Sequence, residues 1–441
     1  MSRLQTMVLV LAVAAPGCGA SNAQTGAPSV GAGSSSVGSA GSIEEVGGAG
    51  SSAGNSAGNS ASAGQSASSA GSAGSAGAKS TGGSAGAAPE PPPPRPTVQP
   101  CSSVSSASGW EKITPPGDLG DAQALGLDPL NVGTIYVQMH KGGNGAHSST
   151  DGLYMSDNCG STWKRVPQGR GTSDPGTNIN TGSLVALIID PVDSKVMYTA
   201  SNYGPGGIWK SVNGGVDFEQ VVPESVGKYV NQMWFSSLDM EPTNHKHLAA
   251  ANHANCNGPH SPNCIAETRD AGLTWTLIPA PVGWAEGNGV SVLGDQTLLF
   301  VTNMSGMYLT KDDGANWTRV GDGANGPGQG FPMYKATDGT YYLASSYGLI
   351  SSKDLTKWTN VKGGLYRSMA GTGQNIIISG FYEFNYQTAS MGALASDKWS
   401  TLGADSAPKG GNGGVWLTYE AEHHLLYSSN FDVGLWRIVT N

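Results

Sequence analysis

The chain has 441 residues and a formal net charge of −9, with 23 Lys and Arg against 32 Asp and Glu. No basic stripe stands out, so we do not expect nucleic-acid binding. Residues 19–88 are nearly all Gly, Ser and Ala, a composition that buries too little apolar surface to fold. This leaves residues 101–441, enough for one large core.

The first eighteen residues resemble a bacterial lipoprotein signal. Arg3 precedes an apolar run at 7–15 that is too short to span a bilayer, and Cys18 stands where such signals have their lipidated cysteine. We therefore expect a signal peptide at 1–18, with simple cleavage and secretion as the alternative. Residues 19–100 are expected to form a disordered linker that ends in a Pro-rich spacer. The protein is then extracellular or on the cell surface, attached to the outer membrane through Cys18 or secreted.

The four remaining cysteines are an even number, as expected in an oxidising compartment. Cys256 and Cys264 lie in one loop, so we pair them. Cys101 and Cys159 are then expected to join the start of the domain to its first repeat. A four-cysteine zinc site is the alternative, but the spacing does not fit a zinc ribbon.

Seven short segments carry an aromatic residue followed by a hydrophobic one three positions later, and this repeat predicts the architecture. The aromatic residues are Trp110, Trp163, Phe218, Trp275, Trp317, Trp358 and Trp399. Seven units predict an all-β, seven-bladed β-propeller with four strands per blade, named A to D from the axis outward. The first aromatic belongs to an orphan strand D, and the last unit ends at strand C. The N-terminal strand is therefore expected to complete the last blade and close the ring.

The turns between strands C and D share a motif at 156–163, 211–218, 268–275 and 310–317, with shorter forms at 352–358 and 396–399. Its polar residues (Asn158, Asn213, Asp270 and Asp312) can bond backbone amides across the turn, and its glycines (Gly160, Gly215, Gly272 and Gly314) supply positive φ. The motif resembles the Asp-box, or bacterial neuraminidase repeat, of sialidase- and xyloglucanase-like propellers. The resemblance implies that these residues brace turns. It also implies that ligands bind at the opposite end, among the D–A and B–C loops.

Glycoside hydrolysis is the leading functional hypothesis, because two acids can flank a scissile bond in these loops. The acidic candidates are Asp151, Asp174, Glu286 and Glu383, with Asp432 in the last B–C loop. Xyloglucanase-type propellers carry an acidic residue just before Gly-x-Tyr of the first blade, and residues 151–154 are similar. Asp151 and Glu286 are thus the predicted catalytic pair. The resemblance also implies glycan binding between two propellers, of which this chain accounts for one.

Two other hypotheses use the same loops. A polysaccharide lyase acting on a uronate would use His or Tyr as base and acid with a cation nearby, from the set His140, His147, His253, Tyr203 and Arg170. A binding domain without catalysis would stack sugars or engage a protein through side chains such as Trp284, Tyr203, Tyr347 and Tyr382. Further substrate-binding candidates are His260 and Glu383. The sixth B–C loop is expected to include Tyr386.

Sialidase activity is disfavoured, because no Arg-Ile-Pro segment exists and Arg is scarce in these loops. The histidines could bind a metal only if the fold brings their side chains together. We expect no cofactor, and a monomer that binds a polysaccharide or oligosaccharide.

Overall fold

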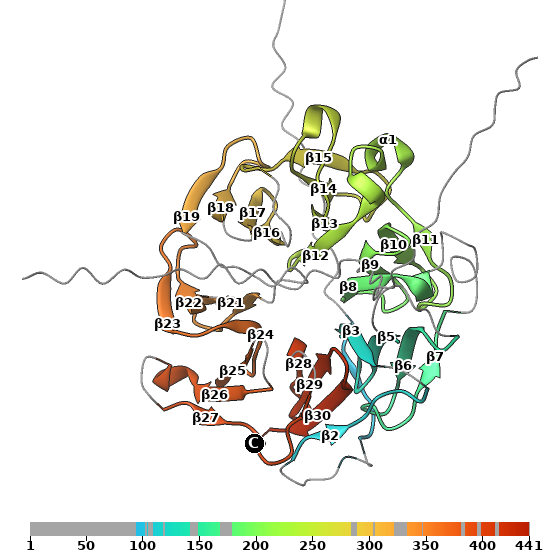
Figure 1. The fold of residues 1–441 in the computed structure, drawn as a ribbon, viewed down its shortest axis with the longest axis vertical. Coiled ribbons are helices and arrows are strands. Elements are labelled where there is room, and N and C mark those ends of the chain that lie inside the picture. The colour runs from blue at the N-terminus through green and yellow to red at the C-terminus, as the bar shows by residue number, and fades with distance from the viewer. Residues whose placement is uncertain are drawn as a thin grey trace, which may run out of the picture. The chain divides into compact units, whose positions relative to one another are not determined.

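The computed structural model describes residues 94–101, 104, 109–117, 120–141, 149–167, 179–283, 289–302, 305–321, 333–345, 347–380, 384–394, 398–410 and 414–440. The expected signal peptide, its Cys18 and the linker up to residue 93 lie outside them. All but two of the described strands form seven four-stranded antiparallel sheets, arranged in a ring in Figure 1. The predicted seven-bladed β-propeller is confirmed.

The blades follow the chain in order. Blade 1 contains β3 (Asp121–Leu127), β5 (Ile135–His140), β6 (Gly152–Ser156) and β7 (Lys164–Arg165). Blade 2 contains β8 (Ser183–Ile189), β9 (Met197–Tyr203), β10 (Gly207–Ser211) and β11 (Glu219–Gln220). Blade 3 contains β12 (Phe235–Glu241), β13 (Asn244–Asn252), β14 (Cys264–Thr268) and β15 (Thr276–Pro279). Blade 4 contains β16 (Gly289–Gly294), β17 (Thr297–Thr302), β18 (Gly306–Thr310) and β19 (Thr318–Gly321).

Blade 5 contains β20 (Met333–Lys335), β21 (Tyr341–Ser345), β22 (Gly348–Ser352) and β23 (Thr359–Lys362). Blade 6 contains β24 (Tyr366–Gly371), β25 (Asn375–Gly380), β26 (Tyr386–Ser390) and β27 (Ser400–Thr401). Blade 7 contains β28 (Gly414–Glu420), β29 (Leu425–Asn430), β30 (Gly434–Val439) and the N-terminal β2 (Glu111–Lys112). Short helices in the connections are η1 (Ile179–Thr181), α1 (Glu224–Gly227), η2 (Asn231–Met233), η3 (Gly258–His260) and η4 (Met391–Ala393).

The ring closes as expected, because β2 pairs antiparallel with β30. Glu111 lies opposite Arg437, and the Arg437 Nε atom donates to the Glu111 carboxylate at 3.0 Å. Residues expected in the Pro-rich spacer also join the domain. The strand β1 (Thr97–Val98) pairs in parallel with β4 (Asn131–Val132), which lies between β3 and β5, and the two form a separate two-stranded sheet. The described contacts of the propeller therefore begin before Cys101.

The hydrophobic core is divided among the interfaces between neighbouring blades. Seven clusters of buried side chains occur in the described residues, each shared by two adjacent blades. Each cluster contains, or is packed against by, one repeat aromatic: Trp110, Trp163, Phe218, Trp275, Trp317, Trp358 or Trp399. Phe218 of blade 2, for example, packs with Tyr136 and Leu153 of blade 1. The repeat thus sets the architecture by placing one ring at every blade interface.

The C–D turns are braced in the predicted way. The Oδ1 atom of Asp270 accepts a hydrogen bond from the Thr274 amide at 2.8 Å, and Asp312 does the same with Asn316. The Thr268 hydroxyl accepts from the amide of Gly272, whose φ is +84°. The residue before each glycine is also left-handed, which the sequence did not predict: Cys159, Gly214, Ala271 and Asp313 have φ between 56° and 73°.

One expectation about blade 6 is wrong. Tyr386 does not lie in the B–C loop but begins β26, and its side chain is fully buried. Its hydroxyl lies 2.8 Å from the Ser428 Oγ atom and donates to Asn430 at 3.2 Å. These partners satisfy the phenol inside the core, so a tyrosine stands where five of the other blades begin strand C with Gly.

Candidate functional site

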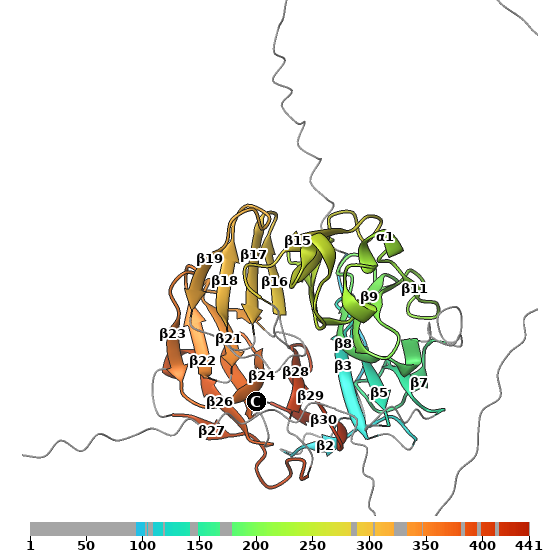
Figure 2. The ribbon, with the colours of Figure 1, turned by 45° about the horizontal axis from the view of Figure 1, so that its top comes forward.

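One end of the propeller collects the D–A and B–C loops, and four titratable side chains of blades 1 and 7 lie there. Asp121 begins β3, His140 ends β5, and Asp151 directly precedes β6. Asp432 lies between β29 and β30. Figure 2 shows the strands of each sheet side by side, and their alternating directions place these four positions at the same end. The braced C–D turns lie at the opposite end.

Asp151 is fully buried. One carboxylate oxygen accepts the backbone amide of Lys141 at 2.8 Å, and the other lies 3.8 Å from the Nε2 atom of His140. The guanidinium of Arg165 donates to the carbonyl oxygens of Ser149, at 2.9 Å, and of Asp151. Strand D of blade 1 therefore anchors the end of this B–C loop, and the structure brings together the predicted His140 and Asp151.

Among these four residues, Asp121 has a carboxyl group whose pKa lies well above its ordinary value. Burial raises the pKa of Asp121 to about 6; the hydrogen bond from the Asp432 amide opposes this, and the charges of Asp432 and Asp151 raise it further. The Asp432 side chain itself is exposed. We call Asp121, Asp151, Asp432 and His140 the acid cluster. It contains one carboxyl group, that of Asp121, which is protonated in mildly acidic water and lies beside other carboxylates. Such a division of roles is what acid-assisted cleavage needs.

A second group, the aromatic cluster, consists of Tyr203, Trp234 and His253 from blades 2 and 3. The Tyr203 hydroxyl lies 2.9 Å from the Nε2 atom of His253. The Tyr203 and Trp234 rings meet edge to face with centroids 5.0 Å apart, and the Trp234 indole donates to the Gly204 carbonyl at 3.3 Å. His253 is buried, whereas Tyr203 and Trp234 are half-buried. Two rings held in this way offer apolar faces with fixed polar edges.

The residues just before Trp234 line a pocket of about 460 Å³. Its wall includes the amide side chains of Gln220, Asn231, Gln232 and Asn257, together with the charged residues Glu224 and Lys228. The D–A loop between blades 2 and 3 supplies most of this lining, while Gln220 comes from β11 and Asn257 from the B–C loop of blade 3. Amide and charged groups in a pocket that also contains apolar residues such as Val222 and Met233 match the mixed polar and apolar surface of a sugar.

The B–C loop of blade 3 is held as predicted by the Cys256–Cys264 disulfide, and Cys101–Cys159 is also formed. His260 lies in this loop against Tyr229, with ring centroids 5.0 Å apart. Tyr347 lies on blade 5, has 55% of its surface exposed and belongs to neither cluster.

The other predicted site residues lie outside the described parts of the chain: His147, Arg170, Asp174, Trp284, Glu286, Tyr382 and Glu383. The expected pairing of Asp151 with Glu286 stays a prediction.

Sequence reasoning missed Asp121 and Trp234. Trp234 directly precedes the inner strand β12 and is half-buried. For Asp121 one signal was available, a carboxyl at the head of an inner strand whose following residues are almost all buried. A charged group at such a buried position needs a hydrogen-bond or ion-pair partner, or else it serves a function.

In the described part of the chain, no helix is long and apolar enough to cross a membrane. No family model matches the chain. A curated xyloglucanase of Acetivibrio thermocellus is 24% identical over 226 residues, covering 45% of this chain and 25% of that enzyme. The chain spans a quarter or less of the length of the curated relatives that it matches.

Two solved structures share the fold. The GH74 enzyme of Niastella koreensis aligns with a TM-score of 0.54 at 18% identity, over 75% of this chain and 54% of that one. The GH74 xyloglucanase of Xanthomonas campestris aligns with a TM-score of 0.51 at 17% identity, over 74% and 53%. The chain is therefore similar to xyloglucanase-type β-propellers, as its turn motif implied.

Proposed function

We propose that this propeller is a glycoside hydrolase domain that cleaves an extracellular polysaccharide, with xyloglucan as the first substrate to test. The observation that carries the proposal is Asp121, a carboxyl with a raised pKa at the loop end of the ring beside Asp432 and Asp151. The names of the similar proteins support the choice of xyloglucan. The turn residues that resemble Asp-boxes act as braces in this proposal and take no part in the chemistry.

In this mechanism Asp121 donates its proton to the glycosidic oxygen as the bond to the leaving sugar breaks. The exposed carboxylate of Asp432 accepts a proton from the attacking water, whose oxygen forms the new bond to the sugar. The negative charge of the Asp151 carboxylate favours the protonated form of Asp121 before reaction. His140 lies beside Asp151.

The aromatic cluster and its pocket would bind the sugar chain. Tyr203 and Trp234 supply ring faces, and the amides around the pocket supply hydrogen bonds. Both features come from blades 2 and 3, whereas the acids come from blades 1 and 7, so the glycan would extend along the loop end of the ring.

The test is incubation of the full chain with xyloglucan and a panel of other polysaccharides, followed by measurement of new reducing ends. Replacing Asp121 or Asp432 with Asn should lower the rate by about 10²- to 10⁴-fold. Asp157→Asn is a matched control, because Asp157 is exposed on a C–D turn at the other end. A wild-type rate in folded Asp121→Asn contradicts the assignment, and glycan binding without new reducing ends identifies a binding domain.

A lyase is the second candidate, because Tyr203 and His253 are hydrogen-bonded at 2.9 Å. In β-elimination His253 would remove the proton next to a uronate carboxylate, and the Tyr203 hydroxyl would protonate the departing oxygen. The product would carry an unsaturated uronate that absorbs ultraviolet light. Its appearance from a uronate-containing glycan, and its loss in Tyr203→Phe, would favour this candidate over hydrolysis.

We also propose that the protein is exported and attached to the outer membrane through a lipid on Cys18. The signal-like residues 1–18 and the long Gly/Ser/Ala-rich stretch that follows support this location. Labelling with a radioactive fatty acid in the native host should mark the wild type and not Cys18→Ser. Label retained in Cys18→Ser would contradict the anchor. The proposed state is a monomer, which light scattering of the full chain can check.

A further inference from the structure

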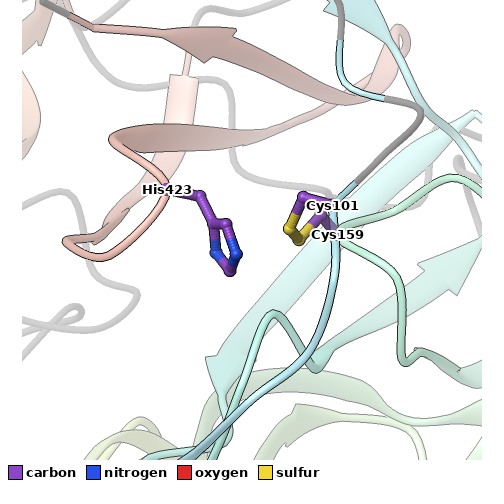
Figure 3. Close-up of side chains that lie close together, drawn as sticks. All are labelled: Cys101, Cys159 and His423. Atoms are coloured by element: carbon purple, nitrogen blue, oxygen red, sulfur yellow. A yellow bond between two sulfur atoms is a disulfide. The ribbon is translucent and has the colours of Figure 1, made fainter.

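A disulfide and a histidine meet at the junction between the first and last blades, on the end of the ring opposite the candidate site. Cys159 belongs to the C–D turn of blade 1, Cys101 follows the N-terminal strand β1, and His423 lies in the turn between β28 and β29 of blade 7. One ligand atom from each residue lies within 4.8 Å of the other two. Figure 3 shows the His423 ring reaching from its turn toward the space beside the two sulfurs.

His423 is held in the way that metal-binding histidines are held. Its Nδ1 atom lies 2.5 Å from a carboxylate oxygen of Glu420, and the other oxygen of Glu420 accepts the amide of Glu422 at 2.7 Å. A carboxylate on one ring nitrogen fixes the ring and leaves Nε2 as the ligand atom. The ring is partly exposed, so an ion from solvent can reach it.

The two cysteines are held near each other by more than their covalent bond. The backbone of Gln99, two residues before Cys101, donates to Val132 at 2.8 Å, and the Cys159 amide donates to Gly133 at 2.8 Å. The Tyr427 hydroxyl and the Arg437 guanidinium also donate to the Cys159 carbonyl. After reduction these bonds keep both thiols next to His423.

We propose that, in the reduced protein, Cys101, Cys159 and His423 bind one Zn²⁺ ion, which would join the N-terminal segment and blade 1, already linked by the disulfide, to blade 7 as well. Two thiolates and one imidazole are a common zinc donor set, with water completing four ligands. Bonds of about 2.3 Å to sulfur require the two sulfurs to move to about 3.8 Å apart, which side-chain rotation can supply. This inference does not depend on the proposed function, because the site lies at the other end of the ring.

The chemistry balances with a phosphine as the reductant. The phosphine takes up the oxygen of one water molecule and becomes a phosphine oxide, while the disulfide gains two electrons and two protons and opens to two thiols. Binding of Zn²⁺ then releases the two thiol protons to the buffer.

The experiment uses the full chain, reduced with a phosphine without oxygen and titrated with Co²⁺ and then Zn²⁺. Co²⁺ should give the absorption of a four-coordinate thiolate complex at one ion per chain, and Zn²⁺ should displace it. His423→Ala should weaken binding at least tenfold, and Cys101→Ser/Cys159→Ser should abolish the thiolate band. Cys256→Ser/Cys264→Ser is the matched control and should bind normally, because the described residues place no third His, Cys, Asp or Glu ligand beside that pair.

Thiol alkylation keeps the test decisive if the reduced chain is unstable. Mass spectrometry measures the alkylation of each cysteine. Zn²⁺ should slow the alkylation of Cys101 and Cys159 and should leave Cys256 and Cys264 of the same molecule unprotected. It should also raise the melting temperature of the reduced wild type and not that of His423→Ala. Equal protection of both cysteine pairs, an unchanged response in His423→Ala, or no protection at all would overturn the zinc site.

Discussion

The Asp121 carboxylate accepts the backbone amide of Asp432 at 2.8 Å, although the two residues are 311 positions apart. This bond spans the junction of blade 1 with blade 7, because Asp121 begins β3 and Asp432 precedes β30. It therefore forms only when the ring is closed, so the acid cluster depends on the closure of the propeller.

Replacing Asp121 with Asn should stabilise the protein at neutral pH. The folded state raises the pKa of Asp121 from 3.8 to about 6, so above pH 6 the buried charge costs on the order of 2–3 kcal/mol. The cost disappears as the pH falls from 6 to 4, because the carboxyl is protonated. Urea unfolding at several pH values should therefore show a higher free energy of unfolding for Asp121→Asn at pH 7.5 and little difference at pH 4. If Asp121→Asn lowered the free energy of unfolding by the same amount at both pH values, burial would not raise the pKa of Asp121.

Tyr203 and Trp234 should affect glycan binding differently. Trp234→Ala removes a ring face and should weaken affinity about tenfold, which corresponds to about 1.4 kcal/mol. Tyr203→Phe keeps its ring but loses the hydroxyl that contacts His253, so hydrolysis and binding should change little. Isothermal titration with a bound oligosaccharide measures the first effect and reducing-end production the second. Unchanged affinity in Trp234→Ala would remove the aromatic cluster from the binding site.

Phe218 should be essential for the contact between blades 1 and 2. Its side chain is 1% exposed and packs with Tyr136 and Leu153, so Phe218→Ala should cost about 3–5 kcal/mol in free energy of unfolding. Val216 in the same turn is 43% exposed, and Val216→Ala should change stability by less than about 0.5 kcal/mol. Chemical denaturation of both variants provides the comparison. Equal costs would contradict the role of the repeat aromatic.

Asp270 should stabilise its C–D turn and take no part in catalysis. Its carboxylate accepts the amide and the hydroxyl of Thr274, both at 2.8 Å or less, so Asp270→Ala should cost about 1–2 kcal/mol. The neighbouring Leu273, 80% exposed, is the control and should tolerate Ala. Polysaccharide cleavage at 25 °C should be unchanged in both variants. Loss of activity in folded Asp270→Ala would mean that the C–D end takes part in catalysis.

His247 should be the most sensitive histidine. It is fully buried between Glu241, at 2.8 Å, and Glu267, at 2.9 Å. Burial opposes its charge, but the hydrogen bonds to Glu267 and Glu241 outweigh this and raise its pKa. His247→Ala removes the buried ring that Glu241 and Glu267 share, leaves Glu267 with Arg269, and should cost about 3–5 kcal/mol below pH 6.

The effect of pH on His247 has a defined sign. Because its pKa is raised in the folded state, its stabilising contribution is complete below the unfolded value of 6.5 and is lost as the pH rises through the folded value. The difference between wild type and His247→Ala should therefore be largest below pH 6 and shrink in alkaline buffer. The exposed Lys246→Ala is the control. A difference that grows with pH would show that His247 is neutral in the folded protein.

The sequence by itself determined the architecture. The seven aromatic positions, the C–D turns with their Asn or Asp and Gly, and the orphan strand at Trp110 predict seven blades and the closure of the ring. These signals are local, because each depends on residues within one turn or one strand and recurs in every blade. The two disulfides followed from loop position and an even count of cysteines.

Only the tertiary structure decided which loops meet. Asp121 acquires its raised pKa from burial next to Asp432, and Tyr203 reaches His253 of the next blade. Tyr386 enters the core because Ser428 and Asn430 of blade 7 satisfy its hydroxyl. Such contacts join residues far apart in the chain, and their existence depends on how loops of different length fold over a closed ring. A repeat pattern specifies the ring, while burial and charge at one rim arise only after the ring has closed.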